Sequence, residues 1–324
     1  MNVLWKLGAY SAALAATFGA AYGIGNAVDP IADEPVSHAQ HRASPSPTPG
    51  DRHGDHAEAG AAATVPGGLQ VSEGGYSIDL KTPRLKAGRS EDIRFLIRDQ
   101  KGRVVTDYEP QHDKELHLIV ASRDLLTFRH LHPTRTANGT WSTPVDLPAA
   151  GDYRVFADFK PAKKDKGLTL GTDLAVSGAY KPAELPEPAA AASVDGYTVT
   201  LNGDLRAAAA SELTLSVSRG GRPVTDLQPY LGAYGHLVAL RAGDLAYLHV
   251  HPNGEPNDGE TEPGPDVSFS TTAPSAGTYR LFLDFKHNDR VHTAAFTVRT
   301  GAPAKAQPVK STPAEQHESG DHQH

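Results

Sequence analysis

The chain has 324 residues with a formal net charge of -7, and 39% of its residues are hydrophobic. This length is enough for two domains of ordinary size, and the acidic balance provides no basic surface, so we expect no nucleic-acid partner. The chain contains no cysteine, which excludes disulfides, thiolate metal sites and cysteine nucleophiles. Its single methionine is Met1, and its 16 histidines are the unusual feature.

An uncharged run rich in Ala, Gly, Leu and Tyr covers residues 7–28, directly after Lys6. As a helix the run is long enough to span about 30 Å of hydrocarbon, and small residues near its end offer a cleavage site. We therefore predict that residues 1–28 form an N-terminal hydrophobic helix, either a transmembrane anchor or a cleaved signal peptide. A buried helix of a soluble protein is the alternative. With an anchor or a signal peptide, the remainder lies outside the cytoplasm, held at the membrane or secreted.

Two segments have too few apolar residues to form a core. Residues 29–66 are rich in Pro and His, and residues 301–324 contain interspersed His, Asp and Glu. We predict that both are disordered, the first as a flexible linker and the second as a tail. Such segments can capture metal ions weakly or serve solubility alone, and the sequence leaves both interpretations open.

The region between these flanks is built twice. Residues 102–133 align with residues 221–252 without a gap, and both segments end in His-x-His-Pro. Further on, residues 151–160 match residues 277–286, sharing Gly-x-Tyr-Arg-x-Phe-x-Asp-Phe-Lys. A unit of about 110 residues is too long for a solenoid repeat, so each copy is predicted to be a domain.

We place the first domain at residues 67–180, the second at residues 193–300, and a linker between them at residues 181–192. Period-two hydrophobic patterns and Gly-containing turn signals predict short strands in both copies. The candidate strands include residues 76–80, 93–97, 116–122, 126–132, 153–159 and 213–217. This pattern predicts an all-β protein with two tandem immunoglobulin-like antiparallel β-sandwich domains.

Three histidines fall at equivalent positions in the two copies, and one aspartate does the same. The candidate metal ligands are His117, His130, His132 and Asp158 in the first copy, and His236, His249, His251 and Asp284 in the second. In a strand, residues two apart project from the same face about 6.5–7 Å apart, so a His-x-His pair aims two imidazoles at one point. The proline after each pair marks a strand end or an open edge, which a hydrated ion can reach.

A hairpin brings His117 alongside His130 and His132, and Asp158 completes a predicted site of three nitrogens and one oxygen. Such a set suits Zn(II) or Cu(II), and the Irving–Williams order favours copper where copper is free. A Cu(I) site is excluded, because the chain has no cysteine and no methionine beyond Met1. The alternative is that the histidines are hydrogen-bonded structural residues and the aspartates pair with nearby arginines.

The His-x-His-Pro strand end and the closing Pro-x-x-Gly-x-Tyr-Arg-x-Phe-x-Asp-Phe segment resemble those of secreted or membrane-anchored bacterial proteins of heavy-metal type, found especially in actinobacteria. At the level of fold, the repeat is also similar to the immunoglobulin-like copper-resistance and YtkA-like domains. These resemblances imply a duplicated immunoglobulin-like fold and metal binding outside the cytoplasm. Copper-resistance domains often use an N-terminal histidine and methionines, and this chain departs from that pattern.

The leading hypothesis is a non-enzymatic extracytoplasmic protein that binds Cu(II) or Zn(II) at one His-rich site per repeat, for metal buffering, resistance or delivery. Its expected partners are the metal ion and, through the N-terminal segment, the membrane. The alternatives are a metal-dependent enzyme with an open three-histidine site, and an adhesion or partner-binding protein with structural histidines. Binding should weaken as the pH falls through about 6.5. The sequence leaves open whether the repeats share a site.

Overall fold

The computed structural model describes residues 65–248 and 250–300, with the side chain of residue 251 left out. The predicted anchor or signal peptide and the predicted tail lie outside the described residues, as does the linker up to residue 64. Within the described residues, no helix has the length and apolar character needed to cross a membrane. These residues form strands and turns, which confirms the all-β prediction.

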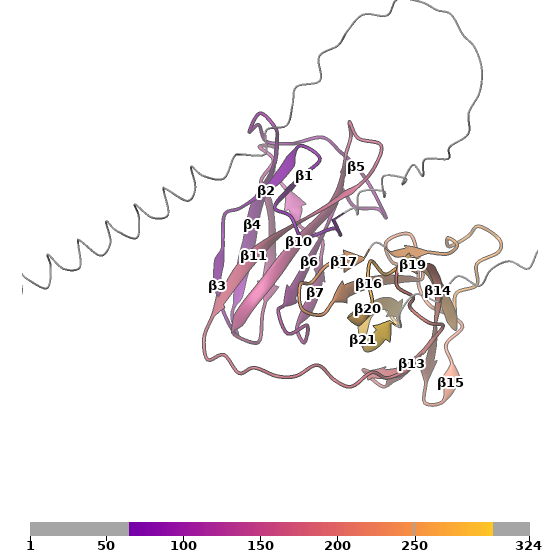
Figure 1. Cartoon of the computed structure of the whole chain (residues 1–324). Helices are drawn as coiled ribbons and strands as arrows, with labels where there is room; N and C mark the ends of the chain where they lie inside the picture. The colour runs from indigo at the N-terminus through magenta and orange to yellow at the C-terminus, as the bar shows by residue number, and fades with distance from the viewer. Residues whose placement is uncertain (1–64, 249, 301–324) are drawn as a thin grey trace, which may run out of the picture. The chain divides into compact units, whose positions relative to one another are not determined.

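The first repeat folds into two sheets. Its strands are, in chain order, β1 (Ser72–Glu73), β2 (Tyr76–Leu80), β3 (Arg84–Lys86), β4 (Ser90–Asp99), β5 (Tyr108–Glu109), β6 (Leu116–Ser122), β7 (Phe128–Leu131), β8 (Thr134–Arg135), β9 (Trp141–Asp146), β10 (Gly151–Pro161) and β11 (Leu168–Ser177). One sheet has the order β1-β2-β4-β9-β8, and the other has the order β3-β11-β10-β6-β7, with β5 paired to β10. Figure 1 shows β6, β7 and β10 running side by side.

The second repeat has the same plan. Its strands are β12 (Ala191–Val194), β13 (Tyr197–Asn202), β14 (Ala210–Arg219), β15 (Arg222–Pro223), β16 (Gly235–Arg241), β17 (Tyr247–Leu248), β18 (Val250–Pro252), β19 (Asp266–Thr272), β20 (Gly277–His287) and β21 (Arg290–Thr300). The sheet orders are β12-β13-β14-β19-β18 and β17-β16-β20-β21, with β15 paired to β14.

The strand order in both repeats is that of the immunoglobulin fold. In the first repeat, β2, β4, β9 and β8 correspond to strands A, B, E and D of that fold, and β6, β10 and β11 correspond to C, F and G. In the second repeat, the corresponding strands are β13, β14, β19 and β18, and β16, β20 and β21. The hydroxyl of Tyr153 donates to the carbonyl of Ala149 at 2.8 Å, and that of Tyr279 donates to Ser275 at 2.8 Å. This tyrosine corner is a mark of immunoglobulin-like sandwiches, so each repeat is such a domain.

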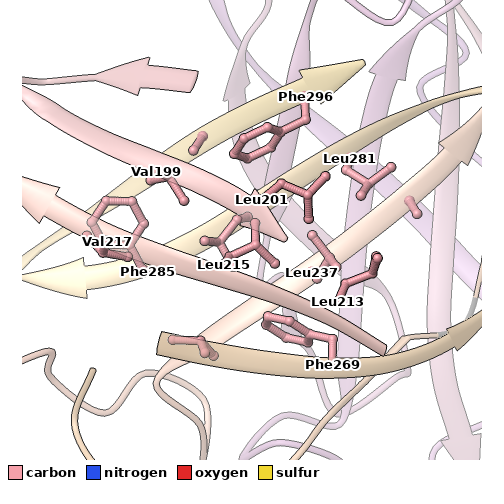
Figure 2. Packing of buried hydrophobic residues seen from close by; sticks show 14 of the residues in the cluster. Val199, Leu201, Leu213, Leu215, Val217, Leu237, Phe269, Leu281, Phe285 and Phe296 are labelled. Atoms are coloured by element: carbon pink, nitrogen blue, oxygen red, sulfur yellow. The ribbon is translucent and has the colours of Figure 1, made fainter. Parts of the chain in front are cut away.

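Alternating residues fill the space between the two sheets of each sandwich. In the second repeat the predicted alternation at 213–217 puts Leu213, Leu215 and Val217 into the core. Figure 2 shows these side chains packed with Phe269 from the neighbouring strand β19 and with Phe296 from β21 of the facing sheet. Polar residues between them point away from this core, as a period-two strand requires.

The strand β6 departs from this alternation, because every one of its residues is buried. A strand buried on both faces packs against something on its outer side as well. A third hydrophobic cluster supplies that contact and draws on both repeats. Its buried members are Ile119, Ala121, Leu125, Phe128, Phe156, Val238, Leu240, Leu245 and Phe282. The rings of Phe128 and Phe282 stack with their centroids 4.1 Å apart, so the sheets that carry β6 and β16 pack through their outer faces.

The chain enters the first sandwich through this junction. The carbonyl of Gly67 accepts a hydrogen bond from the backbone of Tyr247, and Gly68 donates to the carbonyl of Thr169. A Cβ on Gly68 would lie 2.4 Å from Cδ1 of Phe156 and 3.3 Å from Cβ of Tyr247, and its φ is +74°. Only glycine fits there without displacing the aromatic contacts between the repeats.

Candidate metal site

The histidines lie on the outer faces of the two sheets that carry β6 and β16. In β6, Leu116 and Leu118 point into the core of the first sandwich, so His117 between them points outward with Ile119. In β16, His236 points outward with Val238 for the same reason. Both histidines therefore lie on the faces through which the repeats pack.

Three histidines of the first repeat meet at this face, as the sequence analysis expected. One nitrogen each from His117, His130 and His132 lies within 4.8 Å of the others. Nδ1 of His117 is 3.1 Å from Nε2 of His130. The ring of His132 lies 5.1 Å from that of His117 and 4.9 Å from that of His130, between centroids. The hairpin of β6 and β7 thus brings the three imidazoles together.

The hydrogen bonds on the far sides of two of these rings determine where their protons lie. Nε2 of His117 is 3.0 Å from the carbonyl oxygen of Gln111 and donates to it, because a carbonyl only accepts. Nδ1 of His130 is 2.8 Å from a carboxylate oxygen of Asp284 and donates to it. In a neutral imidazole the other nitrogen then carries a lone pair.

With both rings neutral, two lone pairs face each other at 3.1 Å, on Nδ1 of His117 and Nε2 of His130. This arrangement is repulsive unless a proton or a metal ion lies between the two nitrogens. Nε2 of His132 is also buried and has no hydrogen-bond partner. Leaving such a group unpaired costs about 1–3 kcal/mol, so it calls for an explanation. A bound ion would satisfy all three nitrogens at once.

Burial keeps the imidazoles of His117, His132 and His236 neutral. Burial, helped by the neighbouring histidines and opposed by the hydrogen bond to Gln111, lowers the pKa of His117 to about 3. Burial likewise lowers the pKa of His132 to about 3 and that of His236 to about 4. Metal ions bind the neutral form of histidine. The cluster therefore holds its imidazoles in the binding form at neutral pH.

The distance between His117 and His130 fits a divalent transition metal. Nitrogen-to-metal distances of about 2.0–2.1 Å place two ligand nitrogens about 3.3 Å apart in a tetrahedral site. The observed 3.1 Å between His117 and His130 is close to this value. His130 is further held by a carboxylate on its second nitrogen, an arrangement typical of metal-binding histidines.

The carboxylate that contacts this site comes from the second repeat. Asp284 accepts a hydrogen bond from His130, and the role of Asp158 as a ligand of the first site stays a prediction. Asp158 accepts a hydrogen bond from Thr169 at 3.1 Å and interacts with Tyr247.

The second copy of the site is described only in part. Nε2 of His236 donates to the carbonyls of Tyr230 and Leu231, at 2.9 and 3.1 Å, as His117 does to Gln111. Its ring lies 6.4 Å from that of His117, between centroids. Residue 249 and the side chain of His251 lie outside what the structure describes. A second site in the second repeat therefore stays a prediction.

One histidine of the cluster was missed by the sequence analysis. The ring of His112 lies 5.3 Å from that of His236 and 6.1 Å from that of His117, between centroids. It does not recur in the second copy, where Leu231 stands in its place. Its position in the turn just before β6 was the available signal, because that turn also provides the carbonyl that His117 contacts.

A cavity of about 450 Å³ opens beside this histidine. Its lining residues are His112, Gly232, Pro252, Gly254, Glu255 and Asp258. Hydrogen bonds from the loop backbone and from Thr261 hold the pKa of Asp258 well below its usual range, so this carboxylate is charged. Acidic residues at the mouth of a site attract cations.

The histidines that occur only in the second repeat have other partners. His287 contacts the hydroxyl of Tyr197 at 2.7 Å and a carboxylate oxygen of Asp226 at 3.1 Å. His292 contacts Asp195 at 2.7 Å. Both histidines are buried and connect strands to neighbouring turns, outside the cluster of His117, His130 and His132.

These features define a class: a tandem pair of immunoglobulin-like sandwiches with a histidine cluster at the junction of the repeats. The sequence profile of DUF8832, a domain of unknown function, matches residues 70–176 and again residues 192–302. The chain belongs to this family, and the two matches coincide with the two repeats. Comparison with curated proteins finds no match. The resemblance to metal-binding families stays a prediction.

Comparison with solved structures finds only distant similarities. The Escherichia coli adhesin FdeC is 16% identical, with 70% of this chain and 65% of that one covered and a TM-score of 0.22. Salmonella alpha-2-macroglobulin reacted with methylamine is 14% identical, with 75% and 15% covered and a TM-score of 0.25. Invasin, a bacterial integrin-binding protein, is 14% identical, with 70% and 39% covered and a TM-score of 0.20. The chain spans less than two thirds of each of these structures, and no function is transferred at such scores.

Proposed function

We propose that the protein binds Cu(II) or Zn(II) outside the cytoplasm and serves in metal buffering, resistance or delivery. The observation that carries this proposal is the meeting of three imidazoles at one point, with Nδ1 of His117 only 3.1 Å from Nε2 of His130. The second nitrogens of His117 and His130 are committed as donors, so neither ring can turn its proton inward without losing a hydrogen bond. A divalent ion resolves that conflict and also takes the buried nitrogen of His132.

The choice between metals follows from the ligand type. Neutral imidazoles suit both Zn(II) and Cu(II), and copper binds more tightly to a given nitrogen site. The oriented rings reduce the rearrangement that binding requires, because each is already fixed by a hydrogen bond to its second nitrogen. This supports a role in holding the ion rather than in chemistry upon it.

The test is a metal titration of residues 65–300, which contain every strand described here, against a competing chelator. With one site per repeat, we expect two tight equivalents of Cu(II) or Zn(II). His132→Ala should remove one equivalent and His251→Ala the other. His292→Gln alters a buried histidine outside the cluster and should leave both equivalents in place.

Failure of residues 65–300 to bind metal tightly would overturn the proposal. Binding that persists unchanged in His132→Ala would overturn the assignment of the site. A melting temperature that does not rise with added metal would also count against binding, because a ligand held only by the folded state stabilises it. An adhesion role with structural histidines would then be favoured.

A further inference from the structure

We propose that the two repeats hold the metal ion jointly, so that filling the site and docking the repeats stabilise each other. This inference rests on the proposed function and concerns how the site is regulated. In this view Asp284 is a positioning residue, which acts on the ion through His130. The second repeat thereby controls a site whose histidine ligands belong to the first.

The contact between Asp284 and His130 is buried. Nδ1 of His130 lies 2.8 Å from Oδ2 of Asp284, and the two side chains are only 6% and 3% exposed. A carboxylate removed from water needs hydrogen-bond donors, and His130 is one of them. Separation of the repeats would leave this hydrogen bond unmade and free the imidazole of His130 to turn.

Contacts within the second repeat fix the position of the Asp284 carboxylate. The hydroxyl of Thr293 donates to Oδ1 of Asp284 at 2.5 Å. Asp284 also lies in the middle of β20, where it pairs across the ladder with His236 of β16 on one side and with Thr293 of β21 on the other. The position of Oδ2 is therefore set by the sheet of the second repeat.

The strands that carry His130 and Asp284, β7 and β20, also form an apolar contact between the repeats. Phe128 lies two residues before His130 in β7, and Phe282 lies two residues before Asp284 in β20. The two phenyl rings stack 4.1 Å apart. Since alternate residues share one face, the stacking and the His130–Asp284 hydrogen bond form one continuous contact. A change that separates these strands would disturb both.

Two consequences follow from linkage. Removing the carboxylate should weaken metal binding, because loss of a group that orients a ligand histidine typically costs 10–100-fold in affinity. Loosening the apolar contact should also weaken binding, although no ligand is touched, because coupling between two equilibria is reciprocal.

The experiment measures the zinc dissociation constants of the full chain by competition with a chelator. The constant of interest is that of the zinc equivalent that is lost in His132→Ala. Asp284→Asn should weaken that equivalent by about 10–100-fold. Phe282→Ala should weaken it too, and the double variant should lose less than the product of the two single effects. Asp195→Asn is the matched control, since it removes a carboxylate that contacts His292 outside the cluster and should leave this equivalent unchanged.

A second measurement distinguishes loss of coupling between the repeats from a general loss of stability. The chain has no cysteine, so single cysteines introduced for Lys101 and Arg222, which are exposed positions in different repeats, can be spin-labelled. Zinc should narrow the distribution of distances between the labels in Phe282→Ala and leave it unchanged in Phe282→Ala combined with Asp284→Asn.

The outcomes separate the two proposals. If the wild-type chain binds zinc, His132→Ala does not, and Asp284→Asn binds within twofold of wild type, joint binding is overturned and the proposed function stands. If the wild-type chain takes up no zinc, both proposals fail. Equal losses in Asp284→Asn and Asp195→Asn would also overturn the specific role of Asp284.

Discussion

The two repeats share a fold but treat their histidine-bearing strands differently. In the first repeat, β7 stays paired with β6 through Leu131, and His130 lies opposite Ile119. In the second, β17 ends at Leu248, and the chain continues as β18, which pairs with β19 of the other sheet. An alignment without gaps therefore does not ensure the same strand pairing. Edge strands are short and change partners more readily than central ones.

The comparison also separates sequence equivalence from function. Asp158 and Asp284 occupy the same position in their repeats and each accepts a hydrogen bond from a threonine on the next strand. In the described residues, Asp284 contacts a histidine of the first repeat, whereas Asp158 contacts Tyr247 of the second. The two aspartates therefore have different partners, because each contacts a residue of the other repeat.

The largest effect is expected at the junction of the repeats. Phe282→Ala should cost about 3–5 kcal/mol of unfolding free energy, as truncation of a buried phenylalanine does inside a core. Phe269→Ala, within the second sandwich, is the matched control and should cost a similar amount. Chemical denaturation measures both. A cost below about 1 kcal/mol for Phe282→Ala alone would mean that the repeats are independent units.

The equivalent arginines of the two repeats should respond unequally. Arg154 donates to the carbonyl of Gly68 and to Asp173, each at 2.7 Å. Arg280 donates to Thr297, but its buried Nε has no partner, and burial lowers its pKa. Arg154→Met should therefore cost about 1.5–3 kcal/mol, whereas Arg280→Met should be close to neutral or stabilising. Thermal or chemical denaturation decides, and equal losses would contradict this difference.

The metal-free protein should lose stability on acidification. The pKa of His236 is about 4 in the folded protein and 6.5 in the unfolded chain. Between these values the unfolded chain binds more protons, so the contribution is complete above pH 6.5 and is lost as the pH falls toward 4. Each such histidine costs up to about 1.4 kcal/mol per pH unit.

His236→Gln and His117→Gln should each flatten the pH dependence of the unfolding free energy between pH 6.5 and 5, measured by denaturant titration. The burial of His117 lowers its pKa to about 3, so its effect should be at least as large. A wild-type stability that is constant over this range would show that the imidazoles accept protons in the folded state. The same burial should let metal binding persist below pH 6.5, in contrast to the simpler expectation from unperturbed histidine.

The smallest effect is expected where the repeats are most alike. Tyr153→Phe and Tyr279→Phe each remove one hydrogen bond to a carbonyl four residues earlier. Each should cost about 1 kcal/mol. Equal melting-temperature shifts would show that the two corners are equivalent, and a large inequality would show that the repeats differ even there.

Much of the fold could be predicted from the sequence, because strand patterns are local. The predictions for residues 76–80 and 116–122 match β2 and β6 at their bounds, while 153–159 is the middle of the longer β10. The strand predicted at 126–132 is shorter, since β7 covers Phe128–Leu131. Period two and turn signals depend only on neighbours along the chain.

The composition of the site could be predicted only in part. The repeat and the His-x-His spacing brought together His117, His130 and His132, because a hairpin joins their strands. The role of Asp284 could not be found this way, since it depends on how the repeats pack. One signal was present: residues 116–121 read Leu-His-Leu-Ile-Val-Ala, and this near-continuous apolar run indicates a strand covered on both faces.

The crossing of Gly67 and Gly68 between the aromatic side chains of the two repeats has a mechanical consequence. The carbonyl of Gly67 is bonded to Tyr247 of the second repeat, and Gly68 is bonded to Thr169 of the first. Tension applied to the chain ahead of residue 65 would load the seam between the domains before it reached β1. A pull from that side would therefore act on the hydrogen bond between Gly67 and Tyr247, one of the links between the repeats, before it acted on the strands of the first sandwich.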